Sequence, residues 1–284
     1  MALAAAQARP LDVGVVISRQ TFLLILWGAK WPPIREIAVR DDLLDAQASV
    51  DWVASHLPSL QRRIDSWLDA NLIVEIEEVE LAGPENAIVG VEKEPFPLSF
   101  NVEVGAYINA IRSGLDILAT ALAIRHQVAK ARDVQFPVAK SLADYEAGKY
   151  KGARFVERLP ATERGIIESL RPYRGGNDQL WALHHLDILR KHRRLLEVFI
   201  NPAVVQIFDE FGQLKIKGVY SGSMGGNSKT ILAYFPKGAP KPKIDFTGNV
   251  AIDEPPIGGR ATNLVMLLDG FVTLASSIIR LFDK

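Results

Sequence analysis

The chain has 284 residues, of which 48% are hydrophobic, and its 33 Lys and Arg residues balance 33 Asp and Glu residues. This composition excludes a disordered chain, and the zero net charge argues against a strongly basic nucleic-acid coat protein. Because there is no cysteine, the chain cannot form a disulfide, a thiolate nucleophile or a Cys-ligated zinc site. We expect a folded globular protein with one large domain or two modest ones.

Residues 1–34 contain a short apolar run, residues 21–29, that follows Arg9 and Arg19. The run has only nine residues, which is too short for a membrane span, and Trp27 stands where a signal peptide needs a small residue. We therefore expect a cytoplasmic protein without a membrane role. Residues 1–34 are interpreted as an N-terminal extension, either a buried segment or residues upstream of the true start.

Three long segments repeat apolar residues in steps of three and four, which places those residues on one face of a helix. The first segment keeps its phase across Pro58, which predicts one kinked helix and not two. The stripes are Leu43, Ala46, Val50, Val53, Leu57, Leu60, Ile64 and Trp67; Val104, Ile108, Ile111, Leu115, Leu118 and Leu122; and Leu264, Leu267, Phe271, Leu274, Ile278 and Leu281.

Two further helices are predicted from capping and breaking residues. One spans residues 178–200 behind the Gly-Gly-Asn turn, with Asn177 or Asp178 as its N-cap. A shorter helix starts at Thr162 and ends before Pro172.

Alternating apolar residues at 72–76, a turn at 83–86 and a returning run at 87–91 predict a β-hairpin with one acidic side. No helical pattern separates the later strand candidates, which predicts an antiparallel meander. These candidates are residues 203–209, 213–220, 230–235, 244–246 and 250–252.

The predicted fold class is α+β. A helical bundle of long antiparallel helices carries an inserted β-hairpin and an antiparallel β-meander before the C-terminal helix. Since that last helix completes the core, residues 35–284 are expected to form a single domain.

Known catalytic and cofactor motifs are not matched. Residues 222–230 resemble a phosphate-binding loop, but Asn227 and Ser228 replace its Gly and Lys, and a strand follows where a helix is required. His185 and His192 are seven residues apart, too far along a helix to share one ion, and the pair His184 and Asp187 lacks further obvious ligands. We predict neither a metal site nor another cofactor.

Cations gather between residues 149 and 194. Arg190 to Arg194 (RKHRR) holds four of them, and Asp187 precedes Lys191 by one helical turn. This pattern is typical either of a solvated helix face or of a face that binds RNA phosphate or another anion. Few aromatic residues are interleaved, so a stacking platform is not expected. The other cations are Lys149, Lys151, Arg154, Arg171 and Arg174.

Arg112 and Asp116 stand one turn apart beside the apolar stripe of the second long helix. A charged pair at such a seam either fixes the register of packed helices or belongs to a functional site.

Four segments together resemble a widespread group of uncharacterised bacterial proteins. Residues 111–119 (IRSGLDILA) resemble that group's LRSALDHLA helix, and residues 136–138 (FPV) are similar to its FPI. Residues 170–173 (LRPY) are similar to its LQPY turn, and residues 186–193 to its L-N-x-x-D-K-H-R helix. The chain departs from the pattern at Asp187, where the group has Asn, and at Arg190, where it has Asp. The group has no assigned activity, so the resemblance implies a fold and not a function.

The helical core also resembles the HEPN superfamily, whose active members are metal-independent ribonucleases with an R-x(4–6)-H signature. None of the five histidines has an arginine at that distance upstream. The resemblance therefore implies either a HEPN-like shape without the ribonuclease chemistry or a site in which His192 pairs with Arg112 across helices.

These patterns support two hypotheses. We favour a non-catalytic binding or interaction protein with a local basic face, whose binding residues are Arg171, Arg174, Asp187, Arg190 and Arg193 and whose partner is RNA, another anionic ligand or a second copy of the chain. The alternative is a divergent HEPN-like ribonuclease, in which His192 performs acid–base chemistry beside stabilising cations. Its catalytic residues are Arg112, Asp116, Lys191 and His192.

Overall fold

The structure is a computed structural model. Residues 39–284 form one compact unit. The predicted N-terminal extension, residues 1–34, lies outside the described residues, as does the loop at 219–228. The structure describes residues 40–78, 85–128, 134–192, 194–196, 198–208, 214–218, 229–238, 243–252 and 262–284.

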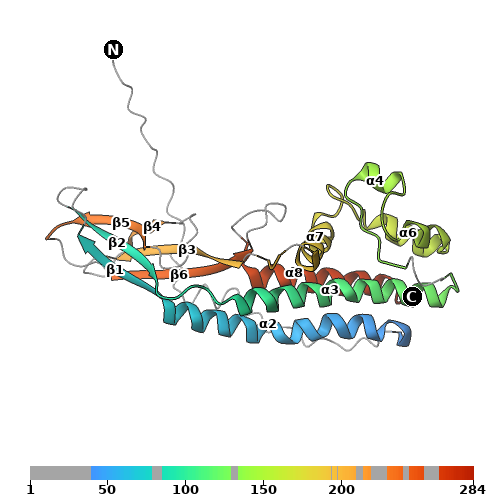
Figure 1. The fold of residues 1–284 in the computed structure, drawn as a ribbon, viewed down its shortest axis with the longest axis horizontal. Helices are drawn as coiled ribbons and strands as arrows, with labels where there is room; N and C mark the ends of the chain where they lie inside the picture. Colours follow the sequence, from blue (N-terminus) through green and yellow to red (C-terminus); the bar gives the residue numbers. More distant parts are fainter. Residues whose placement is uncertain are drawn as a thin grey trace, which may run out of the picture. The chain divides into compact units, whose positions relative to one another are not determined.

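Three long helices, α2 (Leu44–Asn71), α3 (Leu98–Arg125) and α8 (Leu264–Leu281), pack lengthwise on one another (Figure 1). The start of α2 lies beside the ends of the other two, so α2 is antiparallel to both. The backbone N–H of Arg40 donates to Asp283 Oδ1 over 2.8 Å, and Arg125 Nε donates to Asp42 Oδ2 over 2.7 Å. The predicted α+β class with a helical bundle is confirmed.

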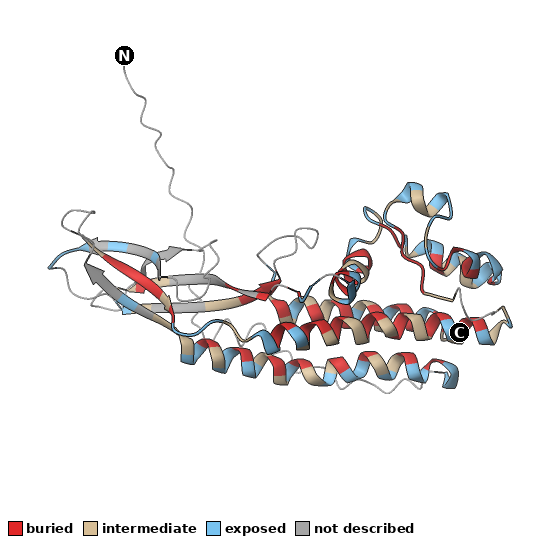
Figure 2. Ribbon diagram, in the orientation of Figure 1, coloured by how far each residue is buried: buried red, intermediate tan, exposed pale blue. Residues whose placement is uncertain are grey.

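The buried faces of α2 and α3 follow the predicted stripes (Figure 2). The six α3 positions are fully buried, and α2 continues as one helix through Pro58. At the end of α2, Leu68 is buried in place of the predicted Trp67. On α8 the buried face is broader than predicted, because this helix contacts α2, α3 and α7. Leu268 and Ala275 are fully buried there, whereas Leu281 is 37% exposed.

Gly114 allows the close approach of α2 and α3. A Cβ at this position would lie 3.0 Å from Val50 Cγ2 and 3.1 Å from the carbonyl oxygen of Ala46. An alanine here would require Val50 or the α2 backbone to shift, so the glycine lets the two long helices pack closely.

The predicted hairpin is confirmed as β1 (Leu72–Glu78) and β2 (Glu85–Glu92), which pair with Leu72 opposite Glu92. The later strands, β3 (Val198–Phe208), β4 (Leu214–Gly218), β5 (Lys229–Pro236) and β6 (Lys243–Ile252), are also antiparallel, but they do not form a simple meander. β5 pairs with β2, and β6 returns to β3, which gives the strand orders β1-β2-β5 and β4-β3-β6. The predicted order is wrong because apolar alternation marks a strand without encoding its partner.

Residues 134–192 form the second helical part of the compact unit. Its helices are α4 (Leu142–Glu146), α5 (Ala153–Arg158), α6 (Ala161–Ser169) and α7 (Asp178–His192). The α7 helix ends at His192, eight residues before the predicted end, because Val198 and Ile200 are buried in alternation at the start of β3.

Two described helices, α3 and α8, are long and apolar enough to cross a membrane by length and composition alone. The core helices of soluble proteins pass the same test, and 56% of the most apolar window of α3 is buried inside the protein. The structure is compatible with a soluble protein.

Candidate functional site

Arg112 is the centre of a polar network between α3 and α7. Its side chain is 1% exposed, and each of its three nitrogens donates a hydrogen bond. Nε donates to His184 Nδ1 over 3.2 Å, Nη1 to Asp116 Oδ1 over 2.7 Å, and Nη2 to the carbonyl oxygen of Phe136 over 2.9 Å. A guanidinium has five N–H donors in a planar fork, which suits it to join three groups at once. Arg112 thereby links α3 to α7 and to the segment before α4.

Asp116 lies one turn further along α3 and faces both the network and solvent. Its Oδ1 accepts the Arg112 bond and a second one from the backbone N–H of Phe136, over 2.9 Å. Because the side chain is 33% exposed, part of the carboxylate is reachable from outside. Arg112 and Asp116 therefore fix the register of the chain around Phe136, as a charged pair at a helix seam often does.

His184 is the third member of the network. Burial lowers its pKa to about 3, and the positive charges of Arg112 and Lys191 add to this effect. The ring is therefore neutral at pH 7. Since Nδ1 accepts the Arg112 bond, the ring proton is on Nε2. A neutral imidazole with an engaged Nδ1 can donate through Nε2.

Asp187 lies one turn beyond His184 and is 4% exposed. Lys191 Nζ is 2.6 Å from its Oδ2, and Asn109 Nδ2 donates to its Oδ1 over 3.0 Å. The buried carboxylate is thus held by one hydrogen bond from Asn109 of α3 and by one ion pair with Lys191 of its own helix. Arg190, on a neighbouring face, lies with its aliphatic stem against Gly105 of α3.

The structure brings together only part of the predicted catalytic set. Arg112 and Asp116 are in contact, and Lys191 pairs with Asp187. His192 is exposed at the end of α7, where no bond to Arg112 is found among the described residues. Arg193, a predicted binding residue, lies outside the described residues.

His184 takes the place beside Arg112 that was predicted for His192. The spacing in the sequence could have predicted this position of His184. His184, Asp187 and Lys191 follow one another at steps of three and four residues, so they share one face of α7. That face packs on α3.

Residues 111–119, 136–139 and 170–173 are connected by hydrogen bonds beside this network. Residues 111–119 hold Phe136 through Arg112 and Asp116, and the backbone N–H of Ala139 donates to the carbonyl oxygen of Pro172 over 2.8 Å. Ala139 and Tyr173 form an isolated parallel bridge. These bonds connect α3 to residues 136–139 and, through them, to residues 170–173.

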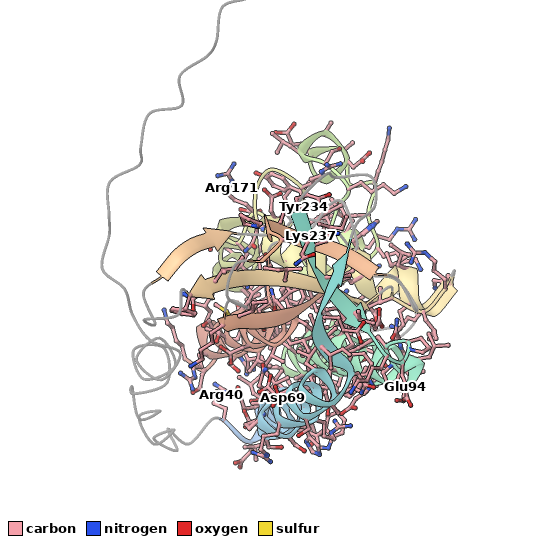
Figure 3. The ribbon with its side chains drawn as sticks, turned by 90° about the vertical axis from the view of Figure 1, so that its left-hand side faces the viewer. Arg40, Asp69, Glu94, Arg171, Tyr234 and Lys237 are labelled. Atoms are coloured by element: carbon pink, nitrogen blue, oxygen red, sulfur yellow. The ribbon has the colours of Figure 1, made fainter. Side chains whose placement is uncertain are left out.

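Two exposed cations are held against aromatic rings. Arg171 projects outward from the ribbon (Figure 3). Its guanidinium lies 5.8 Å from the ring centre of Tyr173, and its Nε donates to the Tyr173 hydroxyl over 3.2 Å. The Arg174 guanidinium lies 5.1 Å from the ring centre of Trp181. Such contacts orient a cation while leaving one of its faces available to solvent.

Further aromatic rings surround these cations. Tyr145 stacks on Tyr150 at 5.0 Å and lies 5.4 Å from Tyr173, and Trp181 stacks on His185 at 4.9 Å. These rings come from α4, α7 and the loops beside them, but Tyr173 and Trp181 are buried, so the expectation that the cations carry no stacking platform stays a prediction. We call five of the exposed cations of residues 134–192 the basic face: Lys149, Lys151, Arg154, Arg171 and Arg174.

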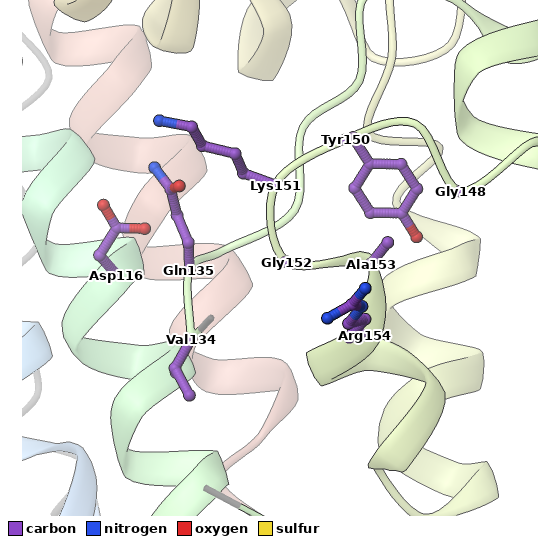
Figure 4. A pocket seen from close by; sticks show the side chains of 9 residues that line it. All are labelled: Asp116, Val134, Gln135, Gly148, Tyr150, Lys151, Gly152, Ala153 and Arg154. Atoms are coloured by element: carbon purple, nitrogen blue, oxygen red, sulfur yellow. The ribbon is translucent and has the colours of Figure 1, made fainter. Parts of the chain in front are cut away.

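A pocket of about 490 Å³ opens next to Asp116 (Figure 4). Gln135, Tyr150, Lys151 and Arg154 supply its other polar side chains. Gly152 forms part of the wall with a φ of +90°, and a Cβ there would lie 2.3 Å from the carbonyl oxygen of Gln135. Only glycine fits that turn without strain.

Among the described residues, no group of three or more His, Asp and Glu side chains is placed to hold a metal ion. Comparison of the chain with models of protein families, with curated proteins and with solved structures gave no match.

Proposed function

We propose that the protein is a non-catalytic binding protein that holds a phosphate-bearing ligand, with RNA as the first candidate, on its basic face. The observation that carries this proposal is the pairing of Arg171 with Tyr173 and of Arg174 with Trp181. Each pair offers an oriented, exposed guanidinium for phosphate, and the ring that orients it is itself buried, at 8% exposed for Tyr173 and 9% for Trp181.

The charge of the region fits a contact with few phosphates. Residues 134–192 contain ten Lys and Arg residues and seven Asp and Glu residues, so the excess of positive charge is small. A protein that coats a long polyanion needs many more phosphate contacts. We expect the ligand to be a short single-stranded segment.

Two features of the polar network favour binding over catalysis. Arg112 is 1% exposed and uses all its nitrogens inside the protein, so it is not positioned to touch a substrate. His184 is neutral and its Nδ1 accepts the Arg112 bond, so that nitrogen is not available as a general base. This network is suited to hold helices together beneath the basic face.

Fluorescence anisotropy of a labelled single-stranded RNA, measured over a series of salt concentrations, tests the proposal. For two phosphate contacts, we expect the slope of log affinity against log salt to be about −1.4. The double variant Arg171→Ala/Arg174→Ala should weaken binding and flatten the slope. The matched control removes two exposed cations outside the basic face, Lys140 and Arg158, and should bind like the wild type. Equal loss in both double variants, or no binding by the wild type, contradicts the proposal.

The alternative is a divergent HEPN-like ribonuclease. The observation that favours it is the Arg112–His184 contact between α3 and α7, which places an arginine beside a histidine without the usual sequence signature. Incubation of labelled RNA with the protein in the absence of divalent cations tests it. Cleavage that disappears in His184→Asn or in His192→Ala would support the ribonuclease and contradict the non-catalytic proposal.

We also propose that the protein is a bacterial, cytoplasmic one. The bacterial origin is proposed because four segments resemble a bacterial group. The cytoplasmic location is proposed because the proposed ligand is RNA. Fractionation of bacterial cells that express the full chain tests the compartment, and recovery in the membrane fraction would contradict it.

A further inference from the structure

We infer that the pocket beside Asp116 is a binding site for a nucleoside monophosphate whose base carries an exocyclic amino group. The inference rests on the proposed function, because Lys151 and Arg154 belong to the basic face, and it narrows that function to one small ligand.

The size of the pocket fits such a ligand. Its volume of about 490 Å³ lies within the range of about 300–1,000 Å³ that small-molecule sites occupy. Three parts of the chain form it: α3 with Asp116, the strand-like segment with Gln135, and residues 148–154. Figure 4 shows Asp116, Gln135 and Lys151 on one side and Tyr150 and Arg154 on the other.

The cations of the pocket are available to an anion. Lys151 and Arg154 are exposed, and neither forms an ion pair within the described part of the chain. Burial raises the pKa of Tyr150 above its ordinary value of 10, so its hydroxyl keeps its proton at pH 7 and can donate. A phosphate accepts hydrogen bonds from all three groups, and the flexible stem of Lys151 lets its ammonium reach the phosphate from the opposite rim.

The other two polar side chains of the pocket, Asp116 and Gln135, offer hydrogen-bond acceptors, so they require a hydrogen-bond donor on the ligand. Asp116 engages its Oδ1 with Arg112 and with the N–H of Phe136, while its side chain remains 33% exposed toward the pocket it lines. The carboxylate therefore offers its second oxygen in an orientation that the buried arginine already fixes. Gln135 adds an amide oxygen on the same side (Figure 4). Two neighbouring acceptors match an amino group and the ring N–H beside it, as in guanine.

A nucleoside monophosphate satisfies both ends at once. Inorganic phosphate satisfies only the cations, and a nucleoside without phosphate satisfies only the acceptors. Uracil has no exocyclic amino group and presents a carbonyl oxygen on each side of its one N–H, and those oxygens repel a carboxylate. The expected order of affinity is therefore GMP first, then UMP, then inorganic phosphate or guanosine.

Isothermal titration calorimetry of the full chain with GMP, UMP, guanosine and inorganic phosphate tests the inference. We expect GMP to bind about tenfold tighter than UMP, and tighter still relative to guanosine and inorganic phosphate, because each of these probes lacks at least one charge-assisted contact. Lys151→Ala and Arg154→Ala should each weaken GMP binding about tenfold or more. The matched controls Lys149→Ala and Arg158→Ala remove exposed cations from the same stretch outside the pocket and should leave the affinity unchanged.

Asp116→Asn tests the acceptor end. It keeps the side-chain volume and an oxygen for Arg112. We expect it to weaken GMP binding and to strengthen UMP binding, because the uracil oxygens no longer face a carboxylate. If Asp116→Asn lowers the melting temperature, Gln135→Ala provides the same test on a side chain outside the Arg112 network.

The outcomes separate the inference from the proposed function. Equal affinities for all four probes, or normal GMP binding by Lys151→Ala and Arg154→Ala, overturn the inference. If RNA binds through Arg171 and Arg174 and GMP does not bind, the inference fails and the proposed function stands. If GMP binds as expected and RNA does not, the pocket is confirmed and the RNA proposal fails.

Discussion

The long helices and residues 134–192 are held together in different ways. In α2 and α3 the contacts repeat every three or four residues and are almost entirely apolar. In residues 134–192 the helices are short, and hydrogen bonds, ion pairs and stacked rings connect them to α3. A periodic apolar surface can be built from many combinations of side chains, whereas a network of directional bonds depends on each of its members.

α3 belongs to both arrangements. Ile108, Ile111 and Leu115 are fully buried in the apolar core, while Asn109 and Arg112 contact α7. The same helix therefore supplies a tolerant surface and a specific one. Substitutions in the two parts of α3 should therefore differ in how much they lower the free energy of unfolding and in which neighbouring segments they loosen.

The largest effect is expected from Arg112→Leu. The change leaves two buried acceptors, His184 Nδ1 and the carbonyl oxygen of Phe136, without a donor, at about 1–3 kcal/mol each, while Asp116 keeps solvent and the Phe136 N–H. Urea unfolding followed by circular dichroism measures this loss. Hydrogen exchange should show faster opening of residues 134–139 and α7, with α2 little changed. A loss below about 1 kcal/mol would show that the network is not the main link to α3.

Gly152→Ala is expected to have the next largest effect. The new Cβ would meet the carbonyl oxygen of Gln135 at 2.3 Å, and the φ of +90° disfavours any residue with a side chain. We expect a loss of roughly 2–3 kcal/mol in the free energy of unfolding, together with loss of the pocket.

Gly165→Ala is the matched control for that substitution. Gly165 lies in α6, where an added Cβ meets nothing within 4 Å. The same chemical change should therefore stabilise the protein by about 0.4–1 kcal/mol, because alanine restricts the unfolded chain. Thermal unfolding that moves both variants in the same direction would contradict the assigned role of the Gly152 turn.

The pH dependence of stability separates His184 from His192. The pKa of His184 falls from its ordinary 6.5 to about 3, so the unfolded chain binds a proton before the folded chain does. This part of the stability is complete above about pH 6.5 and is lost as the pH falls toward 3. Between pH 7 and pH 5 the wild type should lose about 2 kcal/mol more than His184→Asn, measured by urea unfolding at each pH.

His192→Asn is the control for the pH experiment. His192 is exposed at the end of α7, so its substitution should leave the pH dependence unchanged. If His184→Asn and the wild type lose stability in parallel, then His184 is not held neutral by its surroundings.

These contrasts reflect how much of the molecule could be predicted. The stripes of α2 and α3 were predictable because a step of three or four residues is a local property of the chain. The contact of Arg112 with His184 was not, because the two residues are 72 positions apart and neither has a local partner that reveals the other. The pairing of β5 with β2 and the stacking of Tyr145 on Tyr150 beside the cations were not predicted either, because the local sequence does not show which residues become neighbours. The resemblance to the bacterial group remains a prediction.

The smallest effects are expected from breaking single ion pairs, one between the long helices and one in residues 134–192. Arg63 and Glu103 connect α2 and α3 at the surface, where the Arg63 side chain is 50% exposed, so Arg63→Ala should cost less than about 1 kcal/mol. Lys191→Ala removes the partner of the 4% exposed Asp187 and leaves only Asn109 to hold its charge, so it should cost about 1–3 kcal/mol.

Added salt distinguishes the two pairs further. The surface pair is screened, so the cost of Arg63→Ala should shrink at high ionic strength, whereas the cost of Lys191→Ala should largely persist because the carboxylate is buried. Urea unfolding of both variants at low and high sodium chloride measures this difference. If both costs vanish together, Asp187 behaves as a surface residue, and the contact of α7 with α3 rests on apolar packing as it does in the long helices.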